Sequence, residues 1–203
     1  MLAKVNACAV IGLDGVIVDV EVDITTGIPK PPMIIVGLPD VCVQESRERV
    51  QSAIHNTGLE YPRKRVRVNL APATVRKEGS AYDLPIALGI LIANRQIPYN
   101  ALDGGLVMGE LSLDGSVRHI RGVLPMAAVA REQGFKRVFV PAEDAPEAAI
   151  FPDLEVIPVQ SLAELYQHLV GSAIIAPQPP LQPDLVEVLV QTDFREIKGQ
   201  EHV

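Results

Sequence analysis

Tryptophan is absent from this 203-residue sequence and aromatic residues make up only 4% of it, so the core must rest on aliphatic side chains. The same scarcity leaves no aromatic platform on which nucleic-acid bases could stack. The two cysteines, Cys8 and Cys42, lie far apart and form no Cys-x-x-Cys pair, which excludes a disulfide scaffold and a four-ligand zinc site. Positive charge is also scarce: the formal net charge is −7, so the chain as a whole is not an electrostatic DNA-binding protein.

Long hydrophobic runs are missing as well. A membrane-spanning helix needs about 18 or more apolar residues in succession, and the longest apolar stretch, 84–93, is too short. The first 15 residues carry one lysine and then alternate, without the basic region and apolar block of a signal peptide. We therefore expect a cytoplasmic protein with no membrane partner.

Two kinds of catalytic site lack their defining residues. A phosphate-binding loop ends in Gly-Lys-Ser/Thr, and no Gly-Lys pair occurs in the chain, which excludes nucleotide hydrolysis by that mechanism within these 203 residues. The histidines stand at positions 55, 119, 168 and 202, and no two are four residues apart. A histidine-pair metal site therefore has no support, and we expect no metal in this chain.

Hydrophobic periodicity predicts strands and helices in alternation. Apolar and acidic residues alternate over 16–24, which predicts a half-buried strand, and Asp14-Gly15 before it predicts a tight hairpin turn. The segment 81–94 is apolar nearly all round and predicts a central buried helix. The other expected elements are strands at 31–39, 63–70, 136–141 and 154–159, a hairpin at 105–120 around Asp114-Gly115, helices at 41–57, 123–133 and 161–170, and an acidic helical turn at 143–149.

The helix expected over 41–57 has a cap and two distinct faces. Asp40 is positioned to cap its N-terminus, and Gly58 to end it. An apolar stripe predicts the side that meets the core, and a run of charged residues predicts the solvated side. The stripe consists of Val43, Val50, Ala53 and Ile54, and the charged run of Arg47, Glu48 and Arg49.

Ser80 has two interpretations. With Asp83 it forms the S-x-x-D arrangement of a capping box at the start of the buried helix. It also follows Lys77-Glu78-Gly79, and a serine can act as a nucleophile when a desolvated lysine lies within hydrogen-bond reach to take its proton. The first interpretation is structural, and the second predicts a Ser/Lys peptidase.

Basic residues are concentrated in one part of the chain. Arg63, Arg65 and Arg67 share one face of a predicted strand, at a spacing of about 7 Å that resembles the phosphate spacing of a nucleic-acid strand. The alternative is a solvated edge strand that its charges protect from aggregation. Residues 59–80 carry a balance of +4 and residues 140–170 a balance of −6, which favours head-to-tail self-association or separate partners. Further candidates for contact with nucleic acid or a partner are Arg76, Lys77, Arg118 and Arg121.

The composition changes after Gly171. Four prolines within 173–183 disfavour helix and sheet, so 172–186 is interpreted as a linker. The polar stretch that follows, 187–203, is expected to be the beginning of a further module. The chain would then be a fragment of a longer protein whose first domain spans 1–171.

Three long segments of the chain, in the same order, resemble one known family. They are VGLPDVCVQESRERVQSAI (36–54), VNLAPATVRKEGSAYDLPIALGIL (68–91) and GELSLDGSVRHIRGVLPMA (109–127). Together they resemble the N-terminal domain of the Mg-chelatase-like AAA+ ATPases, also called the ComM or YifB family, over residues 1–171. DFREIKGQ (193–200) resembles the entry to the AAA+ module that follows in that family.

The resemblance implies an α/β fold like that of the Lon proteolytic domain and the RadA C-terminal domain. This is an α+β two-layer, ribosomal-protein-like fold with mixed sheets, β-hairpins and about four helices on one side. The full-length protein would be a hexameric, ATP-driven motor acting on branched DNA in natural transformation and recombination. ATP and Mg²⁺ would serve the AAA+ module, which this chain lacks. The implied partners are that module, neighbouring subunits of a homo-hexamer, and single-stranded or branched DNA.

The likeness to Lon also implies where a protease would carry its serine and lysine. Lon-like proteases place the serine two residues after Lys-Asp-Gly, and the matching position after Lys77-Glu78-Gly79 is Ala81. Their lysine, just after Gly-Gly-Leu, falls at Leu124. Neither hydrocarbon can attack a carbonyl or transfer a proton, and Ser80 is one residue out of register. We therefore expect a non-catalytic domain that supports ring assembly or DNA engagement, with an active Ser80 peptidase as the alternative.

Overall fold

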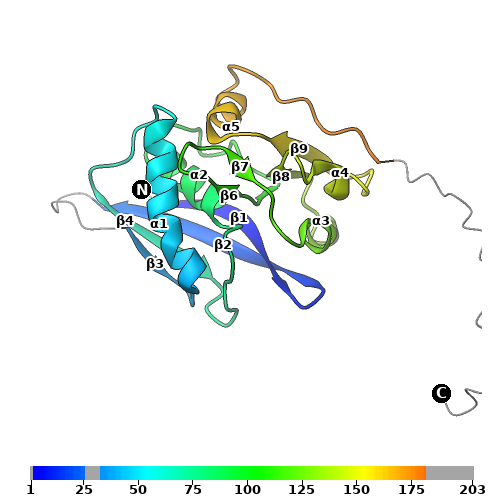
Figure 1. The fold of residues 1–203 in the computed structure, drawn as a ribbon, viewed down its shortest axis with the longest axis horizontal. Helices are drawn as coiled ribbons and strands as arrows, with labels where there is room; N and C mark the ends of the chain where they lie inside the picture. Colours follow the sequence, from blue (N-terminus) through cyan, green and yellow to red (C-terminus); the bar gives the residue numbers. More distant parts are fainter. Residues whose placement is uncertain (1, 26–32, 182–203) are drawn as a thin grey trace, which may run out of the picture.

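The computed structural model describes residues 2–25 and 33–181, and this part of the chain holds five helices and nine strands (Figure 1). The expected module start at 187–203 and the end of the expected linker, 182–186, lie outside the described residues, as do the first residues of the strand expected at 31–39. The helices are α1 (Val41–Asn56), α2 (Asp83–Ala93), α3 (Val123–Glu132), α4 (Ala145–Ala148) and α5 (Leu162–Leu169).

Seven of these strands form one mixed sheet in the order β3-β4-β2-β1-β5-β8-β9. The central strands β1, β2 and β4 pair antiparallel, and the other neighbours pair parallel. Two further strands form a small hairpin around Asp114-Gly115, as expected. The strands are β1 (Leu2–Ile11), β2 (Asp14–Thr25), β3 (Ile34–Val36), β4 (Arg65–Ala71), β5 (Gly105–Val107), β6 (Glu110–Leu111), β7 (Val117–Arg118), β8 (Arg137–Pro141) and β9 (Glu155–Val159).

The turn between β1 and β2 differs from the prediction. Ile11 pairs with Asp14, so Gly12 and Leu13 form the tip of the hairpin and the Asp14-Gly15 pair already belongs to β2. Gly12 has φ +65°, the left-handed conformation that such a tip requires. Gly15 is needed for another reason, because a Cβ there would lie 2.5 Å from Val129 of α3. The glycine therefore permits close packing of the helix on the strand.

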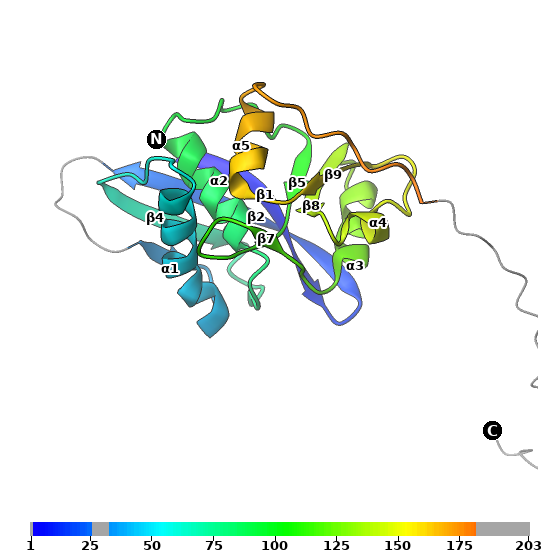
Figure 2. The same ribbon diagram turned by 45° about the horizontal axis from the view of Figure 1, so that its top comes forward.

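The helices cover both faces of the sheet. Along β8, Val138 and Val140 join one buried cluster with α3 and α4, while Phe139 between them joins the other cluster with α1, α2 and α5. Successive residues of a strand point to opposite faces, so the two clusters lie on opposite sides of the sheet. Figure 2 shows α1 and α2 grouped at one end of the molecule and α3 and α4 at the other. The expected α/β class with mixed sheets is confirmed, but helices on a single side were an incomplete prediction.

The two halves of the sheet meet at a narrow junction. β1 belongs to the antiparallel half and β5 to the parallel half, and their ladder registers a single residue pair, Asn6 with Leu106. The Asn6 side chain adds a bond from Nδ2 to the Gly105 carbonyl at 3.4 Å. The sheet is therefore continuous, but its two halves share few main-chain hydrogen bonds.

α2 is the central buried helix that the sequence predicts. Every residue from Asp83 to Ala93 is buried, because a helix that is apolar nearly all round can be covered on all sides only in the middle of a core. Gly89 lets the helix approach β2, since a Cβ there would lie 2.6 Å from Val22. No helix in the described ranges is long and apolar enough to cross a bilayer.

α1 also matches its prediction. Asp40 accepts a hydrogen bond from the Val43 amide at 2.8 Å, which caps the helix. The predicted apolar stripe is fully buried, and it orients the helix against β3 and α2. The stripe residues are Val43, Val50, Ala53 and Ile54.

Candidate functional site

Ser80 lies in the loop before α2 and does not cap it. Its hydroxyl donates a hydrogen bond to the carboxylate of Glu110, at the start of β6. α2 begins at Asp83 with Tyr82 as the cap residue and no side-chain capping bond. The predicted capping box is therefore wrong, because the Asp83 carboxylate is turned toward Arg49 and the Ser80 hydroxyl toward Glu110.

Lys77 does not serve Ser80 as a base. Its amine donates to the Pro72 carbonyl, at the far end of the same loop, and the side chain is fully buried. Burial lowers the pKa of this amine below its usual value. Lys77 was also expected among the residues that contact a partner, and its side chain is fully buried in this structure.

A cavity of about 520 Å³ opens beside Ser80 and Ala81. Ala81 packs at its wall against the core of α3, whereas Leu124 is not among the lining residues and is 38% exposed. The Leu124 amide donates instead to the Glu147 carboxylate at 3.0 Å. The structure thus places Ala81 in the cavity and Leu124 outside it. The lining residues are Cys8, Ala9, Val10, Glu78, Gly79, Ser80, Ala81, Tyr82, Glu110, His119, Ile120, Arg121 and Met126.

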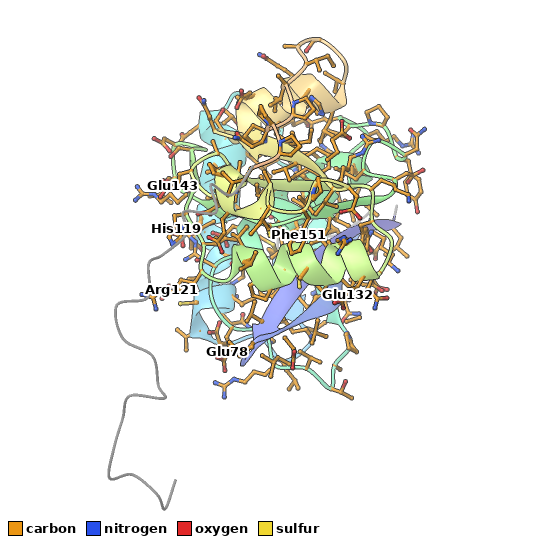
Figure 3. The ribbon with its side chains drawn as sticks, turned by 90° about the vertical axis from the view of Figure 1, so that its right-hand side faces the viewer. Glu78, His119, Arg121, Glu132, Glu143 and Phe151 are labelled. Atoms are coloured by element: carbon orange, nitrogen blue, oxygen red, sulfur yellow. The ribbon has the colours of Figure 1, made fainter. Side chains whose placement is uncertain are left out.

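His119, on one side of the cavity, is paired with Asp144. His119 Nδ1 lies 2.5 Å from Asp144 Oδ1, and the Ile120 amide donates to the other carboxylate oxygen at 3.0 Å. The hydrogen bond to Asp144 and its negative charge raise the pKa of His119. Figure 3 shows His119, Arg121 and Glu78 following one edge of this face. The pair fixes the loop that presents Arg121 to the cavity.

Two further titratable groups of the cavity, Cys8 and Tyr82, are held in their neutral forms. Burial raises the pKa of the Cys8 thiol to about 12, and burial also raises the pKa of the Tyr82 phenol. At neutral pH neither group is an anion, so neither is a ready nucleophile. The Tyr82 hydroxyl is buried and has no hydrogen-bond partner among the described residues.

The Arg49–Asp83 ion pair was missed by the sequence analysis. Arg49 was assigned to the solvated face of α1, but its Nε donates to the fully buried Asp83 carboxylate at 2.6 Å. Its Nη2 donates to the other oxygen of that carboxylate at 3.1 Å. The Leu111 amide donates to the same carboxylate at 3.2 Å. A charged residue within an otherwise apolar helix was the available signal, since a buried carboxylate requires a cation or several donors.

The basic strand β4 lies inside the sheet between β3 and β2, so the edge-strand interpretation is wrong. Arg63 precedes the strand, and Arg65 and Arg67 project from its solvent-facing side. The neighbouring strand β2 places acidic residues on the same face, with Asp23 opposite Arg67 in the antiparallel register. Asn69 donates to Glu21 at 2.8 Å on this face. The solvent-facing side of β4 and β2 therefore carries charges of both signs rather than a purely basic surface.

The other basic candidates do not join this face as one patch. Arg76 pairs with Glu78 at 3.2 Å in the loop after β4. Arg118 donates to the Ser112 hydroxyl within the β6–β7 hairpin, and Arg121 lines the cavity. The candidates therefore lie on separate surfaces.

A family model described as "Subunit ChlI of Mg-chelatase" matches residues 20–144, which is more than half of the chain. The chain belongs to the Mg-chelatase-like ChlI family. Its relatives include a protein named YifB from Escherichia coli strain K12, 36% identical over 201 residues, and the competence protein ComM of Haemophilus influenzae, 35% identical over 208 residues. These alignments cover 98% and 99% of this chain but only 38% and 40% of the relatives.

This ChlI-family chain is also similar, at greater distance, to Lon proteases. It is 25% identical over 200 residues to Lon protease 2 of Bacillus subtilis, covering 91% of the chain and 35% of that protease. An uncharacterized Mycobacterium tuberculosis protein, Rv2897c, is 41% identical over 201 residues, covering 96% of this chain and 40% of the relative. The chain thus spans about two fifths of the curated relatives that it matches at higher identity.

In this ChlI-family chain most carboxylates of the acidic segment 140–170 are engaged within the molecule. Asp144 and Glu147 bind His119 and the Leu124 amide, as described above. Asp153 pairs with Arg131 at 2.8 Å, and Glu164 accepts from the Gln160 amide at 3.0 Å. Within residues 2–25 and 33–181, no cluster of three or more histidine, cysteine, aspartate or glutamate side chains could hold a metal ion.

The first part of the expected linker lies against the domain. Ile175 is nearly buried, and its amide donates to His168 Nδ1 at 3.0 Å. Gln178 and Leu181 donate main-chain bonds to the carbonyls of Val156 and Ala149, at 2.8 and 2.9 Å. These bonds fix the described residues 172–181 along the parallel half of the domain.

Proposed function

We propose that this chain is the non-catalytic N-terminal domain of a ComM-type, ATP-driven motor, and that it contributes contacts rather than bond cleavage. The observation that carries the proposal is the environment of Ser80. Its hydroxyl donates to Glu110, while the amine of Lys77 is held by the Pro72 carbonyl. A serine needs a positioned base to attack a carbonyl, and within residues 2–25 and 33–181 no lysine amine is among the hydrogen-bond partners of Ser80.

The motor itself would lie in the longer protein. Membership of the ChlI family and the similarity to the competence protein ComM support a parent that binds ATP and Mg²⁺ in its AAA+ module and acts on branched DNA during transformation and recombination. In that setting the domain would contact its own AAA+ module and neighbouring subunits of a cytoplasmic homo-hexamer. Three exposed apolar side chains from the end of β3 to the start of α1, those of Val36, Leu38 and Val41, support such a contact.

The peptidase alternative is favoured by the likeness to Lon proteases, and a labelling experiment separates it from the proposal. We expect the chain to give no labelling with a fluorophosphonate probe and no turnover of casein or of short fluorogenic peptides. The Ser80→Ala variant should behave identically in both assays. Labelling or turnover that disappears in Ser80→Ala would establish a Ser80 nucleophile and refute the non-catalytic assignment.

DNA engagement by this domain would use Arg63, Arg65 and Arg67. Arg63 and Arg67 are exposed. Arg63 lies just before β4, and Arg65 and Arg67 lie on the solvent-facing side of that strand. The acidic residues of β2 on the same face weaken the local potential, because Asp23 lies opposite Arg67. We therefore propose a weak, backbone-directed contact with single-stranded or forked DNA rather than base-specific binding.

The salt dependence of DNA binding tests this contact. Each phosphate contact with single-stranded DNA contributes about 0.7 to the slope of log affinity against log salt, so three arginines contribute at most about 2. Because β2 offsets part of the charge, we expect a decrease in slope of about 1 when Arg63, Arg65 and Arg67 are all changed to glutamine. A control with Arg95, Arg131 and Lys136 changed to glutamine removes the same charge elsewhere and should leave the slope nearly unchanged. Equal slopes in parent and test variant would reject β4 as a DNA contact.

A further inference from the structure

Residues 172–181, which we call the strap, lie along β9 at one edge of the seven-stranded sheet. The Glu155 amide at the start of β9 donates to the Lys136 carbonyl on the β8 side, so the next residue, Val156, turns its carbonyl to the open edge. Gln178 of the strap donates to that carbonyl at 2.8 Å. Figures 1 and 2 both show the chain running from α5 past β9 toward α4. The strap thus takes the position that a further strand would occupy.

A single side chain anchors the first part of the strap. His168, in the last turn of α5, accepts a hydrogen bond at Nδ1 from the Ile175 amide at 3.0 Å. Ile175 is the one buried residue of the strap. The imidazole stands edge-on to the buried Phe139 ring of β8, with ring centroids 6.1 Å apart. The histidine is therefore packed on the core and bonded to the strap at the same time.

The bond to Ile175 requires an unprotonated Nδ1. A ring nitrogen of histidine accepts a hydrogen bond only when it carries no proton, so the neutral ring holds its proton on Nε2. A proton on Nδ1 would set one donor against another, because the Ile175 amide can only donate. The other strap bonds among the described residues end on the carbonyls of Gln167, Val156 and Ala149, which do not titrate.

Charged groups of three elements surround His168. Burial lowers the pKa of its ring and Arg137 of β8 lowers it further, whereas Glu155 of β9 and Glu164 of α5 oppose that shift. Arg137 and Glu155 also face each other at 3.9 Å. The ring is therefore neutral at pH 7 and gains its proton below the usual histidine value of about 6.5.

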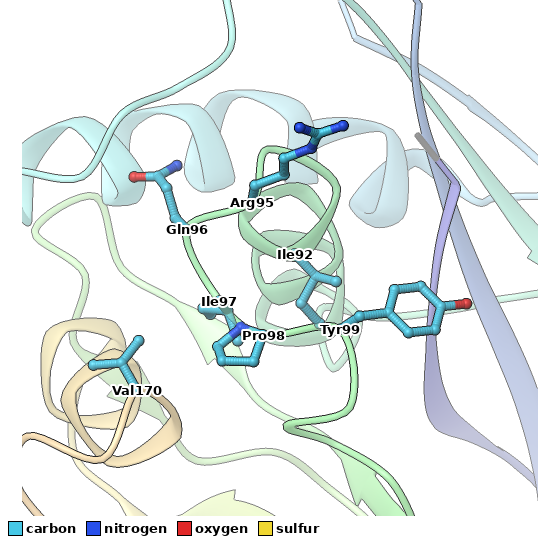
Figure 4. A pocket seen from close by; sticks show the side chains of 7 residues that line it. All are labelled: Ile92, Arg95, Gln96, Ile97, Pro98, Tyr99 and Val170. Atoms are coloured by element: carbon cyan, nitrogen blue, oxygen red, sulfur yellow. The ribbon is translucent and has the colours of Figure 1, made fainter.

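The end of α5 also borders a cavity of about 530 Å³ (Figure 4). Val170, two residues after His168, lines it together with the end of α2 and the loop that follows. Arg95 is the one arginine or lysine of the described lining, and none of the lining residues is a histidine, an aspartate or a glutamate. The cavity therefore places no second acid or imidazole beside the anchor of the strap.

We propose that His168 is an acid-sensitive latch: a proton from solvent binds Nδ1, the bond to Ile175 breaks, and the strap leaves the β9 edge. Only the neutral ring makes this bond, and only while the strap is docked, so the released state binds the proton more tightly. Docking is therefore complete at neutral pH and is lost as the pH falls below about 6.5. The inference does not depend on the motor and DNA roles proposed above.

Amide exchange of the ¹⁵N-labelled 203-residue chain tests the latch. We expect the protection of the Ile175 and Gln178 amides, relative to the intrinsic exchange rate at each pH, to fall about tenfold between neutral pH and about pH 5, the effect of losing one hydrogen bond. The midpoint should coincide with the titration of the His168 ring protons, and the amides of α2 should keep their protection. Strap amides that stay protected after His168 has titrated would overturn the proposal, as would a ring that stays neutral until the domain unfolds.

Two variants of the latch separate its acceptor from its charge. His168→Asn offers an oxygen near the position of Nδ1 and does not titrate, so the strap should stay protected throughout the pH range. His168→Phe keeps a ring against Phe139 but has no acceptor, so Ile175 should lose about tenfold in protection even at neutral pH. His55→Asn removes an exposed imidazole of α1 and should keep the parental pH dependence. A folded His168→Asn protein that releases the strap at the parental midpoint would show that another group controls it.

Discussion

Replacing Arg49 with methionine is expected to lower the free energy of unfolding by about 3 kcal/mol at neutral pH. Methionine retains most of the aliphatic volume, but it leaves the fully buried Asp83 carboxylate with only the Leu111 amide and local side-chain donors. An uncompensated buried charge costs far more than a lost surface ion pair. Urea unfolding followed by far-ultraviolet circular dichroism measures the effect. Arg47→Met, on the same helix, is the control, because Arg47 bonds the Gln44 carbonyl of its own turn and no buried carboxylate among the described residues.

The effect of Arg49→Met should decrease at low pH. Burial raises the pKa of Asp83, and removing the guanidinium raises it further, since Arg49 is the main group opposing that shift. A carboxyl whose folded pKa lies above its unfolded value of about 4 contributes stability at low pH and loses it as the pH rises through the folded pKa. The difference in the free energy of unfolding between variant and parent should therefore decrease as the pH falls toward 4. A difference that stays constant or increases would mean that Asp83 is not the uncompensated charge.

Gly37→Ala is expected to destabilise the domain by about 3 kcal/mol or more. Gly37 follows β3 with φ +103°, and a Cβ at this position would lie 2.1 Å from the Leu70 carbonyl oxygen of β4. A backbone atom cannot move aside as a flexible side chain can, so β3 would have to separate from β4. Thermal unfolding measures the loss.

Gly58→Ala provides the matched control for Gly37. Gly58 also has a positive φ, +77°, but a Cβ there would meet no heavy atom within 4 Å. The control should therefore cost only the conformational penalty of about 1 kcal/mol. Similar losses in the two variants would show that the contact with Leu70 does not decide the need for glycine at position 37.

Elements specified by local sequence were predicted well. Asp40 and the apolar stripe that includes Val43 and Val50 were sufficient to predict α1, because a cap and a 3.6-residue period act within a single helix. The alternation of valines and acids over 16–24 was sufficient for β2, whose buried residues are those of the predicted apolar face. The all-apolar segment that became α2 was placed correctly at the centre of the core.

Features that depend on contacts distant in sequence were not predictable from local patterns. Arg49 lies 34 residues before Asp83, and nothing within α1 indicates that its guanidinium turns inward. The arginines of β4 suggested an edge strand, but only the pairing of β3 shows that the strand is internal. Cross-strand register likewise decides that Asp23 faces Arg67, so the electrostatic character of that surface could not be read from the charge of 59–80 alone.

The cavity beside Ser80 is lined by side chains of both cores of the domain. Tyr82 belongs to the core around α2, while Cys8, Ile120 and Met126 belong to the core around α3, on the opposite face of the sheet. A substitution that changes the volume of this cavity would therefore alter the packing on both faces at once.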